Sequence, residues 1–479
     1  MKKLNDIEPG IVFEYFEEIC SIPHGSENSE KICNYLLDFA KNNNLRAISD
    51  DAYNVIIYKD ATKGYENHKP LILQAHTDMV CQKDKSSQID FLKDGLDIYI
   101  DKDFIRANGT TLGADNGIAV AMIMAILESN DLLHPPIEAV FTTDEEIGMI
   151  GAGELDLSKL NGKRMINIDS EESDTLTVSC AGGSEFEMNV PYTTEKNTGT
   201  NVTIEVTGLK GGHSGVEIDK GRINANILIG RILNHLKNKI DFDIISINGG
   251  TKANAITPSG VADILVYDFK AFQDIFDTYT DILKRELKSR EETLNISYSK
   301  ISEGEFDILE ISAKDKLIYL LITTPSGVVD MSLEIENLVE TSLNLGILKT
   351  DKEKITFIYA LRSNKITALD FLEEKLIAIS QYNDCPYKLS GRYNPWEYKE
   401  NSNLKDIYIS EYKNKFNQSP KIAAIHAGLE CAVFAEKIKD LDCIAMGPDI
   451  IGAHTVEERL SISSTKAIFE LLCKIIEKC

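Results

Sequence analysis

The chain has 479 residues, of which 43% are hydrophobic and 27% are charged, so its composition is that of an ordinary globular protein and its length predicts two or three domains. Its formal net charge of −25 argues against a nucleic-acid partner and against an anionic membrane surface, because both attract basic proteins. No apolar run approaches the ~18 residues that a membrane-spanning helix needs, so no membrane partner is expected.

At the N-terminus, Met1-Lys2-Lys3 is basic but no apolar segment follows it, so we expect no signal peptide. The nine cysteines are scattered between Cys20 and Cys479 with no C-x-x-C pair, a pattern typical of reduced thiols rather than of a disulfide framework. Both features predict a cytoplasmic protein.

The first elements alternate between helix and strand. Apolar residues at helical spacing predict helices over Pro9–Cys20 and Glu27–Asn42. Short apolar runs bounded by polar connections predict strands over Asn54–Tyr58 and Leu71–Leu73. This part of the chain therefore indicates an α/β domain.

His76 and Asp78 follow the strand at Leu71–Leu73, and residues two apart in a strand point to the same side. Burying an imidazole and a carboxylate together costs several kcal/mol unless both find partners. A metal ion would be such a partner, with His76 as its ligand and Asp78 orienting the ring. The alternative is a polar strand end in a surface loop.

More acidic residues follow at similar places. The Gly-rich segment Asn108–Gly117 delivers Asp115 to the start of a predicted helix over Ile118–Glu128, where it is either a metal ligand or a helix N-cap. The predicted strand Ile137–Thr143 ends in Asp144-Glu145-Glu146. Three consecutive acids repel one another unless a cation lies nearby, although a solvated acidic turn is the alternative.

The predicted strand Met165–Ile168 ends in Asp169. Three strands thus end in His76, in Glu145 with Glu146, and in Asp169. In open α/β sheets, ligands bind in the crevice at the carboxyl ends of the strands. We therefore expect these side chains to line one such crevice.

From about residue 186 the pattern changes to alternating β segments, and the predicted strands span residues 201–206, 261–269, 306–313 and 354–361, with helices over 223–237, 272–287 and 333–339. Near residue 392 the α/β pattern returns, with strands over 423–426 and 443–446 and helices over 404–412, up to 437, and over 463–477. No low-complexity linker separates these regions. We therefore predict a catalytic domain formed by residues 1–185 and 393–479, with residues 186–392 inserted as a lid domain.

The eight histidines divide by context. His68, His134 and His235 lie in polar connections or on a helix and are expected at the surface, and the context of His24 decides nothing. The other four, His76, His213, His426 and His454, lie in Gly-containing or strand-end loops, where function concentrates.

Two histidines with several carboxylates form the ligand set that zinc accepts, and manganese or cobalt also fit such a set. Two ions bridged by one carboxylate, ~3.5–4 Å apart, can activate a water molecule for attack on a carbonyl. Glu145 and Glu146 are adjacent, so one could bind metal while the other faces the water, and their spacing does not say which.

Six segments occur in an order that resembles one enzyme family: Ala75–Val80, Leu112–Gly117, Thr143–Gly148, Asn167–Asp169, Gly212–Gly215 and Gly452–Thr455. In this order they look like the co-catalytic di-zinc exopeptidases of the aminoacylase/carnosinase clan. Ser21-Ile22-Pro23 and His426-Ala427-Gly428-Leu429-Glu430 favour the branch of aminoacyl-histidine dipeptidases (Xaa-His or β-Ala-His dipeptidases). The resemblance covers essentially the full length.

The resemblance implies an α/β, zinc-exopeptidase-like catalytic domain with a mixed sheet and helices on both faces, and an inserted α+β lid. It implies two divalent metal ions per subunit, zinc with manganese or cobalt as alternatives. The implied ligands are Asp115 as the bridge, His76 with Asp169 for one ion, and Glu146 with His454 for the other.

Other roles are implied in the same way. Glu145 would be the general base, Asp78 would support His76, and His213 of the lid would polarise the scissile carbonyl. The implied substrate contacts are Asn254, Arg362 and Gly428. The resemblance further implies a homodimer and a cis peptide bond between Asp115 and Asn116.

The sequence thus predicts a cytoplasmic metallopeptidase that hydrolyses unblocked dipeptides. A dipeptide carries a carboxylate, and Arg362 is the best candidate to bind it because guanidinium pairs with carboxylate bidentately, although a structural salt bridge is the alternative. A preference for histidine rests on the resemblance alone. The rival functions are a metal-dependent N-acyl amino acid deacylase of the same clan and a metal-binding scaffold without catalysis.

Overall fold

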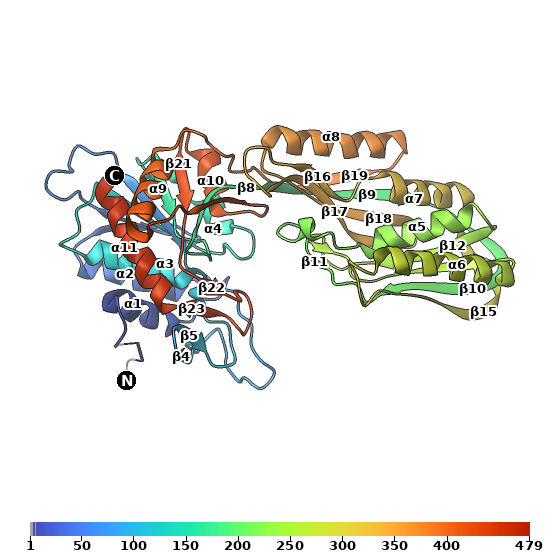
Figure 1. Cartoon of the computed structure of the whole chain (residues 1–479), viewed down its shortest axis with the longest axis horizontal. Coiled ribbons are helices and arrows are strands. Elements are labelled where there is room, and N and C mark those ends of the chain that lie inside the picture. Colours follow the sequence, from blue (N-terminus) through green and yellow to red (C-terminus); the bar gives the residue numbers. More distant parts are fainter. Residues whose placement is uncertain (1–2, 5) are drawn as a thin grey trace. The chain divides into compact units, whose positions relative to one another are not determined.

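The structure is a computed structural model, which describes residues 3–4 and 6–479. The chain forms two compact units (Figure 1). Unit 1 contains the chain up to Cys180, together with Trp396–Ala424 and Leu429–Cys479, and unit 2 contains Ala181–Pro395 with Ile425–Gly428. The predicted boundaries lie a few residues from these, and the return of Ile425–Gly428 to unit 2 was not foreseen. The assignment of catalytic and lid roles to the two parts stays a prediction.

Unit 1 is built on a mixed sheet whose strands lie in the order β1 (Arg46–Ser49), β2 (Val55–Lys59), β6 (Ile137–Thr142), β3 (Leu71–His76), β7 (Arg164–Asn167), β21 (Asp442–Ala445), β8 (Thr175–Cys180) and β20 (Lys421–Ile425). Strands β6, β3, β7 and β21 run parallel to one another, and β1, β2 and β8 pair antiparallel. The predicted α/β class with a mixed sheet is therefore confirmed.

The parallel strands are short apolar runs because both of their faces are covered. Every residue of β3 and β6 is buried, including the polar Gln74 and His76. The carboxyl ends of parallel strands meet at one edge of the sheet. That edge therefore collects the segments that follow β3, β6, β7 and β21.

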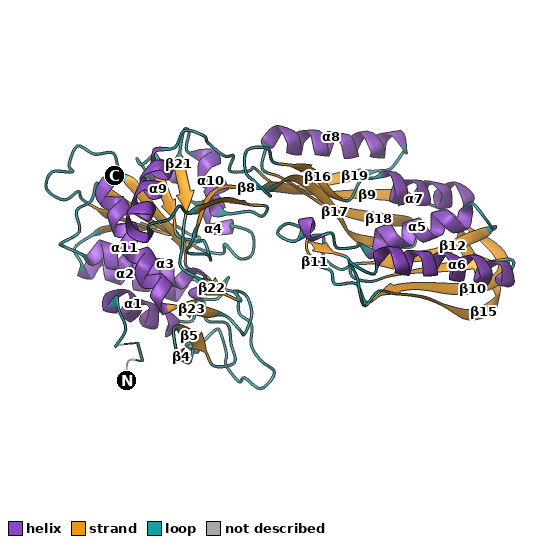
Figure 2. Ribbon diagram, viewed as in Figure 1, coloured by secondary structure: helices purple, strands orange, loops and turns teal. Residues whose placement is uncertain are grey.

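The helices of unit 1 (Figure 2) comprise α1 (Gly10–Cys20), α2 (Glu30–Asn42), α3 (Ala114–Glu128), α4 (Ile150–Glu154), α9 (Asn403–Phe416), α10 (Glu430–Lys437) and α11 (Ile462–Lys478). Helices α2, α3, α9 and α10 pack on strands of this sheet, whereas α1 packs on α3, α4 on α10 and α11 on α9. Helix α3 is apolar on all sides from Ile118 to Leu127, which is typical of a helix enclosed by the rest of the domain. It packs on β3 and on α1. Lys59 caps the C-terminal end of α3, where its Nζ atom donates to the carbonyl oxygen of Ile126 at 3.0 Å.

A small four-stranded sheet, with the order β22 (Ile450–Ile451), β23 (Arg459–Ser461), β5 (Phe104–Ala107) and β4 (Ile98–Asp101), also belongs to unit 1. Strand β23 pairs with β5 through Leu460 opposite Ile105, and helix α11 begins directly after it. This sheet fixes the segment that carries His454.

Unit 2 is a sheet with helices packed on one face. Its antiparallel strands lie in the order β15 (Asn295–Leu309), β10 (Thr194–Thr207), β14 (Gly260–Val266), β12 (Phe242–Gly249), β17 (Val339–Thr350), β18 (Lys354–Ser363), β9 (Gly182–Pro191) and β19 (Tyr387–Tyr393), with β16 (Gly327–Met331) beside β17. Alternate residues such as Val202, Ile204 and Val206 are buried, as expected for a sheet with one covered face. They share one core with helices α5 (Ala225–Lys237), α6 (Phe269–Leu287), α7 (Ile311–Thr323) and α8 (Ile366–Tyr382).

Three sequence-based predictions are wrong. Residues 333–338 form a loop rather than a helix and β17 begins at Val339, because the Ser332 hydroxyl accepts the N–H groups of Glu334 and Ile335 and Asn337 takes a positive φ of 61°. The strand predicted over 306–313 ends at Leu309, and α7 begins at Ile311. His134, expected at the surface, is buried, with its Nδ1 atom 2.8 Å from the Pro135 carbonyl oxygen.

In the part of the chain that the structure describes, no helix combines the length and apolar character needed to cross a membrane.

Candidate metal centre

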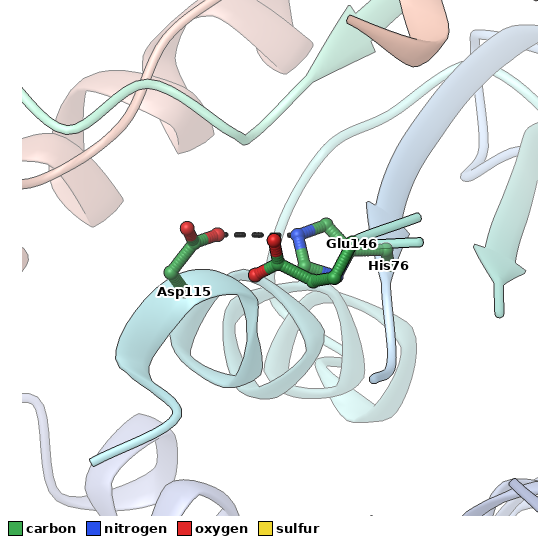
Figure 3. A group of neighbouring side chains, drawn as sticks. All are labelled: His76, Asp115 and Glu146. Carbon is green, nitrogen blue, oxygen red and sulfur yellow. Dashed lines mark hydrogen bonds and ion pairs between the residues drawn. The ribbon is translucent and has the colours of Figure 1, made fainter. Parts of the chain in front are cut away.

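Five predicted ligand residues come together at the carboxyl edge of the parallel strands in unit 1. His76 ends β3, Glu146 follows β6, Asp169 follows β7, Asp115 lies in the first turn of α3, and His454 follows β22. Figure 3 shows His76, Asp115 and Glu146, whose nearest ligand atoms all lie within 4.8 Å of one another. The sheet edge and the helix end therefore assemble nitrogen and oxygen atoms from five separate segments.

Asp115 stands between the two histidines. Its Oδ1 atom lies 3.1 Å from His76 Nε2, and its Oδ2 atom lies 3.1 Å from His454 Nε2. Asp169 Oδ1 is 3.4 Å from the same His76 nitrogen, and Glu146 Oε1 is 3.0 Å from the same His454 nitrogen. Each imidazole nitrogen thus faces two carboxylate oxygens.

This donor set fits a pair of divalent cations. One ring nitrogen carries at most one proton, so it cannot donate a full hydrogen bond to each of two carboxylates. A cation can accept the nitrogen and both oxygens together, and zinc prefers imidazole and carboxylate ligands of this kind. Asp115 offers one oxygen to each side, which suits a carboxylate that bridges two ions.

Asp78 fixes the ring of His76 from the side away from this cluster. The Asp78 Oδ1 atom lies 3.3 Å from His76 Nδ1, and the backbone oxygen of Asp78 lies 3.0 Å from the same nitrogen. Nδ1 therefore faces Asp78, and Nε2 points to Asp115 and Asp169. The orienting contact predicted for Asp78 is present.

The same Asp78 carboxylate also holds the acidic turn after β6. It accepts the backbone N–H of Glu145 at 3.0 Å and that of Glu146 at 3.4 Å, and the hydroxyl of Ser26 donates to it at 2.8 Å. One buried carboxylate thus positions both a candidate ligand and the neighbouring candidate base. Sequence analysis did not foresee these contacts.

The cluster carries excess negative charge. Burial and the neighbouring acids Asp115 and Glu146 raise the pKa of Asp169 to about 6, although His76 opposes the shift. Burial raises the pKa of Glu145 well above its usual value, with Asp169, Glu430 and Glu146 adding to the shift. Hydrogen bonds with Asp115 and Glu146 raise the pKa of His454 to about 11. The raised pKa values of Asp169, Glu145 and His454 reflect the crowding of acids in this cluster, which indicates a site suited to cations.

The start of α3 is shaped to present Asp115. Gly113 precedes the helix with a positive φ of 66°, which favours glycine, and a Cβ atom there would lie 2.7 Å from Met79 Sδ, so the methionine side chain would have to move. The Asp115–Asn116 peptide bond is cis, as predicted. Asn116 ties the helix to the end of β3 and to the residue after β7, since its amide nitrogen donates to the Ile168 carbonyl at 2.7 Å and its amide oxygen accepts the His76 N–H at 3.3 Å.

Sequence reasoning missed four residues that support this cluster: Ser26, Asn116, Glu430 and Glu458. Glu430 of α10 accepts hydrogen bonds from Gln74 and Thr142 beneath the strand ends, and Glu458 accepts backbone N–H groups before and within the first turn of α3. Asn116 and Glu430 stand inside segments that the resemblance had already marked. No local signal identifies Glu458.

Unit 2 contains the other predicted functional residues. His213 lies in the short strand β11 (Gly212–His213), which pairs with β13 (Ala255–Ile256) beside Asn254. His213 Nδ1 accepts the backbone N–H groups of Gly215 and Val216, each at 3.2 Å. Nε2 therefore carries the ring proton and is free to donate it. Burial and the charge of Arg362 lower the pKa of His213, which keeps the ring neutral.

Arg362 at the end of β18 is a buried guanidinium, with only 9% of its surface exposed. Its NH1 group donates to the Tyr393 hydroxyl at 3.0 Å, and its Nε atom is buried without a hydrogen-bond partner. Among the described residues, no carboxylate forms a salt bridge with it. The alternative of a structural salt bridge is therefore wrong for this arginine.

His426 is buried near His213 and Arg362 in the same unit. Its Nε2 atom lies 2.7 Å from the Ser342 hydroxyl and its Nδ1 atom 3.1 Å from Asn364 Oδ1. Burial and the charge of Arg362 lower the pKa of His426 to about 3, so it is neutral at physiological pH. Gly428 lies two residues further on, in the segment between β20 and α10.

Comparison with known proteins identifies the family of this chain. The model of peptidase family M20/M25/M40 matches residues 72–478. The cytosol non-specific dipeptidase of Escherichia coli (strain K12) is 36% identical over 482 aligned residues, covering 100% of this chain and 99% of that protein.

Solved structures give the same result. Aminoacylhistidine dipeptidase from Vibrio alginolyticus superimposes with a TM-score of 0.91 at 34% identity, covering 99% of this chain and 98% of that one. An aminopeptidase from Bacillus cereus shares the fold with a TM-score of 0.58 at 15% identity, covering 98% and 99%. The family resemblance predicted from the sequence is thereby confirmed: this chain belongs to peptidase family M20/M25/M40.

Proposed function

We propose that this chain is a metal-dependent dipeptidase that cleaves unblocked dipeptides. The observation that carries the proposal is the cluster in which Asp115 stands between His76 and His454, each facing a second carboxylate. A dipeptidase that matches the whole chain at 36% identity supports this substrate class.

Two divalent ions, zinc or alternatively manganese or cobalt, fit the ligand cluster. His76, Asp115 and Asp169 would hold one ion, and Asp115, Glu146 and His454 would hold the other. When bound, such ions supply Lewis acidity, which lowers the pKa of water and polarises a carbonyl.

Glu145 is the proposed general base. Its backbone is held by Asp78, and it directly precedes the ligand Glu146, so its carboxylate belongs to the same turn as the cluster. In this role Glu145 takes a proton from the attacking water and passes it to the leaving amine. A positioned carboxylate contributes about 10²–10⁴-fold to the rate in this way.

His213 is the proposed donor to the scissile carbonyl. Its Nδ1 atom is occupied by two backbone N–H groups, so the ring offers Nε2–H as a neutral donor. A good donor to a developing oxyanion is worth ~2.7–4 kcal/mol in the transition state. Asn254 is proposed as a neighbouring substrate contact, because the Ser214 N–H binds its backbone carbonyl and keeps it beside His213.

Arg362 is the proposed receptor for the C-terminal carboxylate of the substrate. A buried guanidinium without an acidic partner is costly, and a carboxylate ligand satisfies it with two parallel hydrogen bonds. Tyr393 holds the side chain in place through its hydroxyl. Gly428 is proposed as a further contact on the family resemblance alone.

The E. coli relative is named a cytosol enzyme, which supports a cytosolic location for this chain. The homodimer implied by the resemblance stays a prediction. Preference for histidine at the second position likewise stays a prediction.

The test is a comparison of substrates at equal concentration on the zinc-loaded protein: Ala-His, Gly-Leu, Ala-His amide, a tripeptide and an N-acetylated amino acid. We expect both dipeptides to be cleaved fastest. The amide should lose about 10- to 100-fold in kcat/KM, because a charged hydrogen bond contributes ~1.5–3 kcal/mol.

Each other outcome has a defined meaning. Faster cleavage of the acetylated compound would establish the deacylase instead. Equal cleavage of Ala-His and its amide would remove Arg362 from substrate recognition. If the protein binds two ions but cleaves none of these compounds, it is a metal-binding scaffold without catalysis.

A further inference from the structure

Glu458 is a buried carboxylate to which the reaction assigns no role. Only 2% of its surface is exposed. Its Oε2 atom accepts the backbone N–H groups of Leu112 at 2.7 Å and Gly113 at 3.1 Å. Its Oε1 atom accepts those of Ala114 at 2.8 Å and Asp115 at 3.3 Å. Four consecutive amides of the segment that presents Asp115 therefore converge on one side chain.

Among the described residues, no second acceptor binds these four amides. The first N–H groups of a helix lack acceptors within the helix, and Gly113, at the N-cap position of α3, has no side chain to supply one. A carboxylate is the favoured group at a helix N-terminus because the helix dipole is positive there. Glu458 thus fills the position of a cap from a distant part of the chain.

The segment from His454 to Glu458 is short and internally bonded. The Thr455 N–H donates to the Gly452 carbonyl at 3.2 Å, and the Glu458 N–H donates to the Thr455 carbonyl at 3.1 Å. Strand β23 begins at the next residue and pairs with β5. The position of Glu458 therefore constrains the position of His454.

The two segments meet at two places. Glu458 accepts the backbone N–H groups of Ala114 and Asp115, and His454 Nε2 lies 3.1 Å from Asp115 Oδ2. His454 itself is half exposed, so little packing holds its ring in place. The buried hydrogen bonds of Glu458 therefore restrain the two segments more strongly than the exposed contact between His454 and Asp115 does.

We propose that Glu458 is a positioning residue that locks the His454 segment to the turn carrying Asp115 and so shapes the ion subsite formed by Asp115, Glu146 and His454. The naming of an ion subsite rests on the proposed function. The lock between the two segments, by which we mean the four hydrogen bonds from residues 112–115 to Glu458, does not. A mere helix cap would change stability and affect both ions alike. The proposed role predicts a selective loss at one subsite.

The test compares Glu458→Gln with Glu457→Gln, a matched control one residue away. Glu457 is exposed, and among the described residues its carboxylate pairs with Arg106 alone, at 3.0 Å, so the control removes the same charge but leaves the contacts of Glu458 intact. Zn²⁺ is titrated into each metal-free protein against a chromophoric chelator. We expect Glu458→Gln to bind the first ion like the wild type and the second about 10- to 100-fold more weakly.

Hydrogen exchange of the metal-free proteins gives a second readout that needs no ion. The amides of residues 112–115 should exchange faster in Glu458→Gln than in Glu457→Gln, because the glutamine amide offers one acceptor oxygen in place of two. Glu458→Asp keeps the charge on a shorter stem, so it should recover part of the affinity for the second ion. If Glu458→Gln does not fold, Glu458→Asp decides the question by the same titration.

Equal weakening of both ions, or second-ion affinity in Glu458→Gln equal to that of Glu457→Gln, would overturn the proposal. Unchanged exchange at residues 112–115 would overturn it as well. Failure of the proposed function looks different: the wild type itself would bind fewer than two ions or leave dipeptides intact, while the exchange experiment would still report on the lock.

Discussion

Adjacent residues in the turn after β6 can take different roles because one side chain fixes their backbone. Asp78 accepts the N–H groups of both Glu145 and Glu146. Glu146 then reaches His454, at 3.0 Å, whereas no ion pair joins Glu145 to either histidine among the described residues. The geometry thus favours Glu146 as the ligand and leaves Glu145 for proton transfer, a choice that the sequence spacing left open.

This division can be tested with Glu145→Gln and Glu146→Gln. Glu145→Gln should retain two ions and lose about 10²–10⁴-fold in kcat, because the ligands remain while the base is gone. Glu146→Gln should bind one ion more weakly. Elemental analysis combined with initial rates on Ala-His measures both effects, and the reverse pattern of metal counts would show that the two roles are exchanged.

At the scale of elements, a buried polar network joins helix α10 to three parallel strands beneath the cluster. Glu430 Oε2 accepts from Gln74 Nε2 at 2.5 Å and from the Thr142 hydroxyl at 2.7 Å. Asn167 in turn donates to Gln74 Oε1 at 2.6 Å. These contacts link β3, β6 and β7, so they hold the strand ends that carry the candidate ligands in register.

We expect Glu430→Ala to destabilise unit 1, because Gln74 Nε2 and the Thr142 hydroxyl each lose their shortest hydrogen bond, at a net cost of about 0.5–1.5 kcal/mol for each lost bond. Glu430→Gln should cost less, since its amide oxygen can still accept. Glu436→Ala, an exposed position on the same helix, is the control and should change the free energy of unfolding by less than about 0.5 kcal/mol. Denaturant unfolding of the metal-free proteins measures all three, and equal midpoints for Glu430→Ala and Glu436→Ala would contradict the role of the network.

At the scale of the whole molecule, the chain has a net charge of −25 and gathers several buried acids in one cluster. Ions that bind only the folded state stabilise it, by about 2.7 kcal/mol at a free concentration one hundred times Kd. The metal-loaded protein should therefore be more stable than the metal-free one.

We expect dialysis against a chelator to abolish dipeptide cleavage and to lower the melting temperature. Adding back Zn²⁺, Mn²⁺ or Co²⁺ should restore both, and the ion that restores them at the lowest concentration is the best candidate for the native one. Calorimetry and activity assays on the same samples provide the measurements. Full turnover by protein shown by elemental analysis to be free of metal would contradict the metal requirement.

The sequence alone determined the strand ends and the residues they carry. Leu71–Leu73 and Ile137–Thr143 are recognisable as buried strands because parallel strands covered on both faces are continuously apolar, and the polar residues that follow them stand out. The same contrast made His76, Glu146 and Asp169 recognisable as candidate ligands, and motif order added Asp115 and His454. The helix predicted from apolar spacing over residues 333–339 is wrong, because a serine hydroxyl and a positive φ form a loop up to residue 338 instead.

Only the tertiary structure revealed the groups that support the ligands. Glu458 lies more than 340 positions along the chain from the amides that it binds, and Glu430 lies 356 from Gln74, so no local pattern could pair them. Arg362 became a candidate receptor rather than a salt-bridge partner only when its surroundings were known. The physical reason is the same in each case: local sequence encodes periodicity and turn chemistry, whereas the satisfaction of a buried polar group depends on which distant segments fold against it.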